Sequence, residues 1–134
     1  MSKALRKTKH GCLILNGVRG LKAWELATAE YFVEHGETVE VLVPSLTANS
    51  KNADFLIWGI VWEAKSPVST NRNTLTVMMN RAAKQSENII LDLRRQVGSE
   101  AQSLKLFRKL FAEKKRIKRL LIITKSGKLI EFNR

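Results

Sequence analysis

The segment spanning residues 53–65 constrains the fold of this chain more than any other part of the sequence. Its residues are apolar or glycine except for Asp54, Glu63 and Lys65. Trp58-Gly59 stands at its centre, and a glycine flanked by two apolar runs favours a tight turn between strands. The segment therefore predicts a β-hairpin that is largely buried and that carries three charged groups.

The predicted hairpin brings two carboxylates into register. If the turn is centred between Trp58 and Gly59, Asp54 lies directly opposite Glu63. A loop of two or four residues gives this register, and a loop of three does not. Opposed side chains on one face have Cβ atoms about 4.5–5.5 Å apart, so two carboxylates there repel each other. A divalent cation would remove this conflict, because Mg²⁺ commonly binds one or two carboxylates together with substrate phosphates.

Lys65 is expected beside the same site. Glu63 and Lys65 are two residues apart on one strand, so both side chains point to the same face. A lysine there can hold an attacking water or stabilise the negative charge that develops on phosphorus. The structural alternative is a solvent-exposed Glu63–Lys65 ion pair of little energetic weight. The apolar surroundings favour the functional interpretation, because buried ionisable groups need partners and often mark functional sites.

The remaining sequence predicts a mixed α/β fold, and the length of 134 residues suits one domain with its own core. Gly36 is expected to end the first helix. The expected elements, in chain order, are a strand over 10–16, a helix over 21–35, a strand over 38–43, a loop over 45–52, the hairpin, a helix that Asn73 or Thr74 caps and that runs to about Gln85, a strand over 88–93, a helix over 103–116, and a last hairpin of strands 118–123 and 128–132.

Positive charge gathers at both ends of the chain. Lysine and arginine number 24 against 12 aspartate and glutamate residues, which gives a formal net charge of +12. Residues 1–23 hold six basic and no acidic side chains, and residues 101–134 hold eleven basic and two acidic ones. The middle of the chain, residues 24–100, holds seven basic and ten acidic side chains. Basic ends predict binding to a nucleic-acid backbone or to an acidic protein.

The positive charge near the C-terminus is dense enough to contact phosphates of a nucleic-acid backbone, which needs no recognition of base sequence. Its members lie on or after the helix predicted over 103–116, and they are Lys105, Arg108, Lys109, Lys114, Lys115, Arg116, Lys118 and Arg119. The single cysteine and two histidines exclude a disulfide framework and a histidine-rich metal site. No apolar run approaches the roughly 20 residues that a membrane-spanning helix needs.

The hairpin motif resembles that of the PD-(D/E)XK nuclease superfamily. Asp54 is followed nine residues later by Glu63-Ala64-Lys65, with a predicted helix and strand before the motif and a helix after it. The residue before Asp54 is Ala53, where the motif has proline. The longer string is similar, more narrowly, to the C-terminal tRNase domains of contact-dependent growth inhibition toxins. Its further parts are Ser66-Pro67, the Ala82-Ala83-Lys84-Gln85 run and the strand over 88–93.

This resemblance covers about residues 20–125 and implies an architecture. It implies a single nuclease domain over residues 1–134, with a restriction-endonuclease-like PD-(D/E)XK core and a basic N-terminal segment over 1–20. The core would be a mixed sheet flanked by helices.

The resemblance also implies roles for individual residues. Asp54 and Glu63 would bind a divalent metal, most simply Mg²⁺ with Mn²⁺ or Zn²⁺ as alternatives, and Lys65 would assist catalysis. The superfamily tends to place a glutamate on its first helix. Glu25, eleven residues before the helix-ending glycine, matches that spacing, and Glu30 is the alternative. Either glutamate could instead be a solvated or ion-paired helix carboxylate.

The helix after the motif offers substrate contacts. Arg81, Lys84 and Gln85 share one helical face at spacings of three and four residues. The resemblance makes Gln85 the first candidate for a substrate contact and Lys84 the second. The alternative is that this face is merely solvated.

The function implied is that of a metal-dependent endoribonuclease which hydrolyses phosphodiester bonds in tRNA. The alternatives are a DNA endonuclease of the same fold and a non-catalytic nucleic-acid-binding module. The implied partners are tRNA and an acidic immunity protein, with no membrane. The expected site of action is the cytoplasm, after delivery from another cell as part of a larger chain.

Overall fold

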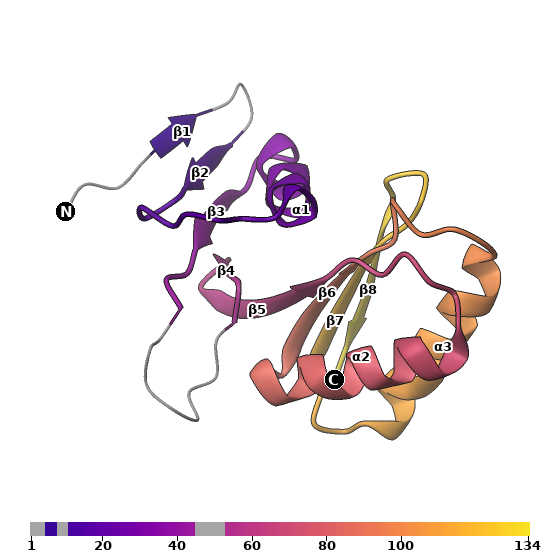
Figure 1. Cartoon of the computed structure of the whole chain (residues 1–134). Helices are drawn as coiled ribbons and strands as arrows, with labels where there is room; N and C mark the ends of the chain where they lie inside the picture. Colours follow the sequence, from indigo (N-terminus) through magenta and orange to yellow (C-terminus); the bar gives the residue numbers. More distant parts are fainter. Residues whose placement is uncertain (1–4, 8–10, 45–52) are drawn as a thin grey trace. The chain divides into compact units, whose positions relative to one another are not determined.

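The structure, a computed structural model, describes residues 5–7, 11–44 and 53–134 (Figure 1). The loop predicted over 45–52 lies outside the described residues. The chain divides into two compact units, residues 1–62 and 63–134, and each unit is described by itself. Both units combine helices with strands, which confirms the predicted mixed α/β class. No helix in the described ranges is long and apolar enough to cross a membrane.

The N-terminal unit is a sheet with one helix. Its elements are β1 (Leu5–Lys7), β2 (Cys12–Ile14), α1 (Ala23–Glu34), β3 (Thr38–Val41), β4 (Phe55–Ile57) and the first half of β5 (Ile60–Lys65). β2 runs parallel to β3, and the pairs β1–β2, β3–β4 and β4–β5 are antiparallel. β1 was not predicted, because three residues in a basic segment give no strand periodicity.

α1 ends as the sequence predicts. Gly36 has a φ of 94°, a left-handed conformation that glycine adopts without strain. Its amide donates to Val33 O at 3.0 Å, and the Glu37 amide donates to Phe32 O at 3.0 Å. This pair of hydrogen bonds is the Schellman motif, which satisfies carbonyls that the helix leaves open. The turn sends the chain back into β3.

The β4–β5 hairpin has the predicted register. The two-residue turn is Trp58-Gly59, with φ values of 56° and 72°, which suit the type I′ turn of tight hairpins. Trp62 is 2% exposed, and its ring meets the Trp58 ring edge to face at 5.9 Å. Val61 is 42% exposed, so the hairpin is less buried than its apolar sequence suggests. The paired residues are Phe55 with Trp62, Leu56 with Val61, and Ile57 with Ile60.

The C-terminal unit packs two helices on one face of a mixed sheet (Figure 1). Its elements are the end of β5, α2 (Arg72–Gln85), β6 (Asn88–Asp92), α3 (Glu100–Glu113), β7 (Arg119–Ile123) and β8 (Leu129–Asn133). β6 runs parallel to β5 and β7, and β8 closes an antiparallel hairpin with β7. The helices bury Leu75, Met79, Phe107 and Leu110 against Ile89 and Leu91 of the central strand β6.

Both helices begin earlier than predicted. Asn71 caps α2 in place of Asn73 or Thr74, and its side chain accepts from the Thr74 amide at 3.1 Å. Ser99 caps α3, whose start was expected at Ser103. The polar first turn of α3 hid its start, because the apolar periodicity begins only at Leu104. α3 also ends at Glu113 and not at Arg116. On this helix Leu104 is only partly buried, whereas Leu106 is 5% exposed and belongs to the core.

Replacing Gly59 by alanine is expected to lower the free energy of unfolding by about 1–2 kcal/mol, because a side chain at a positive φ is strained. No described atom beyond the adjacent residues lies within 4 Å of the added Cβ position, so a clash would not explain the loss. Urea denaturation measures the change. Gly59→Asn is the matched control and should lose less, because asparagine tolerates the left-handed region. Equal stability of Gly59→Ala and the unsubstituted protein would contradict the assigned turn.

Candidate active site

Glu63 and Lys65 lie on the helix-covered face of the C-terminal unit. Glu63 pairs with Ile89 of β6 and Lys65 pairs with Leu91, and both partners belong to the core beneath α2 and α3. Lys65 Nζ lies 3.2 Å from Glu63 Oε2, and their side chains are 32% and 6% exposed. The shared face confirms the prediction from their spacing. The exposed ion pair that was the alternative is wrong for Glu63, whose carboxylate is buried.

A cavity of about 430 Å³ lies between Lys65 and α2. Lys65 and Arg81 are its two cationic lining residues, and the others are Asn73, Thr74, Val77 and Met78. The two cations and the polar helix residues make the cavity suited to an anion, while Val77 and Met78 supply an apolar wall. Arg81 and Lys65 thus line the same cavity.

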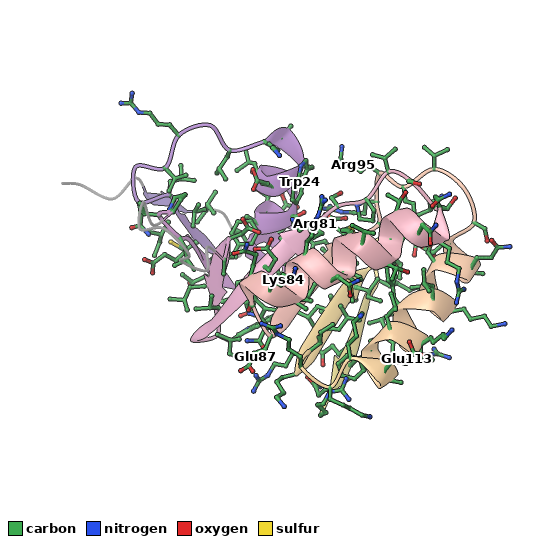
Figure 2. The ribbon with its side chains drawn as sticks, turned by 60° about the horizontal axis from the view of Figure 1, so that its bottom comes forward. Trp24, Arg81, Lys84, Glu87, Arg95 and Glu113 are labelled. Carbon is green, nitrogen blue, oxygen red and sulfur yellow. The ribbon has the colours of Figure 1, made fainter. Side chains whose placement is uncertain are left out.

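The other two predicted substrate residues do not line this cavity. Arg81 and Lys84 lie along α2 (Figure 2), and both are exposed. Gln85 is the last residue of α2 and is half-buried. Of the three side chains that the sequence placed on one helical face, the cavity takes in Arg81 alone.

Asp54 and Glu25 share a second cavity, in the N-terminal unit. This cavity measures about 200 Å³ and is also lined by Arg19. Asp54 directly precedes β4, and its amide donates to Trp62 O at 2.9 Å, which fixes its backbone to the hairpin. Glu25 lies in the first turn of α1, where Oε1 accepts from the Lys22 amide at 2.9 Å. Glu30 does not line the cavity.

The candidate residues offer two kinds of chemistry. Asp54, Glu25 and Glu63 supply carboxylate oxygens, which are ligands for hard divalent cations. Lys65 and Arg81 supply positive charge to a phosphate. Within the described residues, no three His, Cys, Asp or Glu side chains form a ready-made metal cluster.

Arg95 is a residue that the sequence reasoning missed. It lies on the segment after β6 (Figure 2), and its guanidinium donates to the Ser66 carbonyl oxygen at 2.8 and 3.1 Å and to Ser66 Oγ at 2.9 Å. Ser66 directly follows Lys65 and is 7% exposed. These Arg95–Ser66 hydrogen bonds, called the Arg95 clamp, therefore fix the backbone at the end of β5. Parallel strands end at the same edge of a sheet, so an arginine just after one strand can reach a residue just after its neighbour.

The predicted basic surface follows α3 into β7. Its residues are exposed except Lys114, which is half-buried. Lys109 pairs with Glu113 at 3.9 Å, and both side chains are more than half exposed, so this ion pair contributes little. The surface therefore keeps most of its positive charge.

Comparison with known proteins identifies one family and one similar structure. The family model for the contact-dependent growth inhibition CdiA C-terminal domain matches residues 51–129, more than half of the chain. A solved chain titled "CdiA-CT/CdiI toxin and immunity complex from Burkholderia pseudomallei" is similar, with a TM-score of 0.67 and 18% sequence identity. The similarity covers 90% of this chain and 98% of that one, and at this identity it shows the fold alone. No curated protein matches the chain.

Arg95→Ala is expected to loosen the segment after β5, because Ser66 loses three hydrogen bonds from a charged donor. The Val97 amide, which donates to Val68 O at 2.9 Å, should exchange with deuterium faster than in the unsubstituted protein. The free energy of unfolding should fall by about 1–2 kcal/mol. Arg116→Ala, also an exposed arginine of this unit, is the control and should leave both measurements unchanged. Unchanged exchange at Val97 in Arg95→Ala would show that the clamp is dispensable.

Proposed function

This chain belongs to the contact-dependent growth inhibition CdiA C-terminal domain family, and we propose that it is a toxin domain that acts as a metal-dependent endoribonuclease on tRNA. Its proposed core is of the PD-(D/E)XK type, which agrees with a helix and a strand before the β4–β5 hairpin and a helix after it. The toxin role is supported by the fold similarity to a chain from a toxin and immunity complex.

One observation carries the proposal. A buried carboxylate, Glu63, lies 3.2 Å from Lys65 at the edge of an anion-suited cavity that Arg81 also lines. Burial of a carboxylate is costly unless it is paired and hydrogen-bonded, and buried ionisable groups in a cleft are candidates for a functional site. A phosphate of the substrate fits the charge of this cavity.

The proposed metal ligands are Asp54 and Glu63, with Glu25 as a third. All three donors are carboxylates, which suit Mg²⁺ or Mn²⁺ better than Zn²⁺, whose sites favour His and Cys. Mg²⁺ usually keeps several waters and takes substrate phosphates as further ligands. When bound, the ion supplies positive charge to the reacting phosphate and acidifies water.

The side chains of the Lys65 cavity would have separate roles in phosphodiester hydrolysis. Hydrolysis adds water across a P–O bond, and negative charge grows on the phosphate oxygens in the transition state. The Lys65 ammonium can donate to a non-bridging oxygen or hold the attacking water. The Arg81 guanidinium can hold a phosphate bidentately and so orient the scissile group. Arg95 would act through Ser66 as a positioning residue for Lys65.

Purified protein is expected to cleave tRNA in the presence of Mg²⁺ or Mn²⁺ and to stop when a chelator is added. Glu63→Gln and Lys65→Ala should each lower kcat by about 100-fold or more, because each removes charge at the reacting centre. Lys128→Gln, an exposed lysine in the β7–β8 turn, is the control and should cleave normally. Gel analysis of total RNA measures cleavage, and thermal unfolding verifies that each variant is folded.

Other outcomes would identify the alternatives. Intact tRNA in every lane would refute the tRNase proposal. Cleavage of duplex or single-stranded DNA in place of RNA would indicate a DNA endonuclease of the same fold. Binding of RNA without any cleavage by the unsubstituted protein would indicate a non-catalytic module.

The proposed protein partner is an acidic immunity protein. The similar solved chain comes from a complex with an immunity protein, and the net charge of +12 suits an acidic partner. We place this toxin domain within a larger CdiA chain that delivers it from another cell, with the cytoplasm of the recipient as its site of action. This origin agrees with the family's description as a C-terminal domain.

The reading frame next to the gene is expected to encode an acidic protein that binds this chain and blocks cleavage. Binding measured by calorimetry should weaken as salt is raised, because complementary surface charges are screened. A basic protein of similar size is the control and should not bind. A neighbouring product that neither binds nor inhibits would contradict the immunity assignment.

A further inference from the structure

A larger basic cavity lies on the other side of α2, in the C-terminal unit. It measures about 530 Å³ and is lined by residues that precede or begin α2 and by α3 residues from Gln102 to Lys109. Two leucines form an apolar wall. The polar lining residues are Thr70, Arg72, Gln102, Ser103, Lys105 and Lys109.

The charge of this cavity is positive and largely uncommitted. Three of its lining residues are cationic, and no carboxylate lines it. Within the described residues, neither Arg72 nor Lys105 forms an ion pair. Lys109 has only the weak 3.9 Å pair with Glu113. Cations gathered in one recess repel one another, and an anion would relieve that repulsion.

The wall of the cavity is held rigidly. Ser103 is 1% exposed, and its Oγ accepts from Gln96 Nε2 at 2.9 Å. The same amide nitrogen donates to Ser69 O at 3.0 Å, so the segment before α2 is tied to the start of α3. The Thr70 side chain packs so closely on Gly98 that an added Cβ there would lie 2.8 Å from Thr70 Oγ1. The Ser103 and Thr70 part of the lining is therefore set in place before any ligand binds.

The two cavities flank the first turns of one helix. The Lys65 cavity uses Asn73, Thr74 and Val77 of α2, whereas the second cavity uses Arg72 and Leu75. A nucleic-acid strand that occupies the first cavity and continues past the start of α2 would meet the second. Amides and hydroxyls beside the cations suit the phosphate oxygens and 2′-hydroxyl of an RNA backbone.

We propose that this second cavity binds a backbone phosphate of the RNA substrate away from the scissile bond. The proposal rests on the proposed nuclease function, and it adds a site that anchors the strand on the far side of α2. A recessed cavity with neutral hydrogen-bonding groups fits a nucleotide better than the broad face of a protein partner. Anchoring binds ground state and transition state alike, so the site contributes to affinity and not to the chemical step.

The test uses binding of unfractionated tRNA, measured by fluorescence anisotropy across a salt series in a Glu63→Gln background. Adding Lys105→Gln or Arg72→Gln should weaken binding about 5-fold and lower the slope of log K against log salt by about one. Lys128→Gln is the matched control and should stay within about twofold of the background protein. Both target residues are exposed, so each variant is expected to fold, and thermal unfolding verifies this.

Kinetics of the cleavage-competent protein give a second readout. Lys105→Gln should raise KM for tRNA and leave kcat unchanged, whereas Lys65→Ala lowers kcat. Absence of cleavage by the unsubstituted protein would refute the nuclease proposal, but the anisotropy assay would still report on the second cavity. Unchanged tRNA binding by both Lys105→Gln and Arg72→Gln would overturn the inference. Unchanged tRNA binding with weakened immunity-protein binding would also overturn it and assign the cavity to the protein partner.

Discussion

The parallel pairing of β5 with β6 determines what the C-terminal unit presents at Lys65. Because the two strands run the same way, the residues after each strand emerge at one edge, where Arg95 reaches Ser66. The same pairing sets Glu63 and Lys65 over Ile89 and Leu91, on the face that α2 covers. An antiparallel neighbour would have placed the end of β6 at the opposite edge, away from this site.

Burial of Glu63 costs solvation free energy. Apolar residues at this position and at Lys65 would avoid that cost. A carboxylate that is 6% exposed loses most of its hydration, and Lys65 Nζ at 3.2 Å is one of the groups that compensate for that loss. Two apolar residues of similar volume would pack against Ile89 and Leu91 at lower cost. The pair is thus expected to add little to the stability of the fold.

The sequence predicted what is local and missed what depends on strand order. Trp58-Gly59 set the turn and the register of the hairpin, and the two-residue spacing set the common face of Glu63 and Lys65. The cap at Ser99 was missed because a polar first turn carries no periodicity. The Arg95 clamp could not be predicted, since it requires knowing that β6 pairs in parallel with β5. The spacing of Arg95 and Ser66 in the sequence does not show that the two residues are neighbours.

Net charge is a weak guide to where a polyanion binds, because cations differ in how far they are already committed. Arg94 forms an ion pair with the buried carboxylate of Asp92 at 2.7 Å, and Arg95 donates hydrogen bonds to Ser66. Both arginines therefore stabilise the fold. Arg72 and Lys105 carry the same formal charge, yet they line a recess without a carboxylate. A carboxylate partner compensates the field of a cation such as Arg94, and a structural hydrogen bond restrains one such as Arg95. A cation with neither can neutralise a phosphate and release the counterions condensed on it. The proposed path of a bound strand therefore depends on where unpaired cations lie and not on the sum of charges.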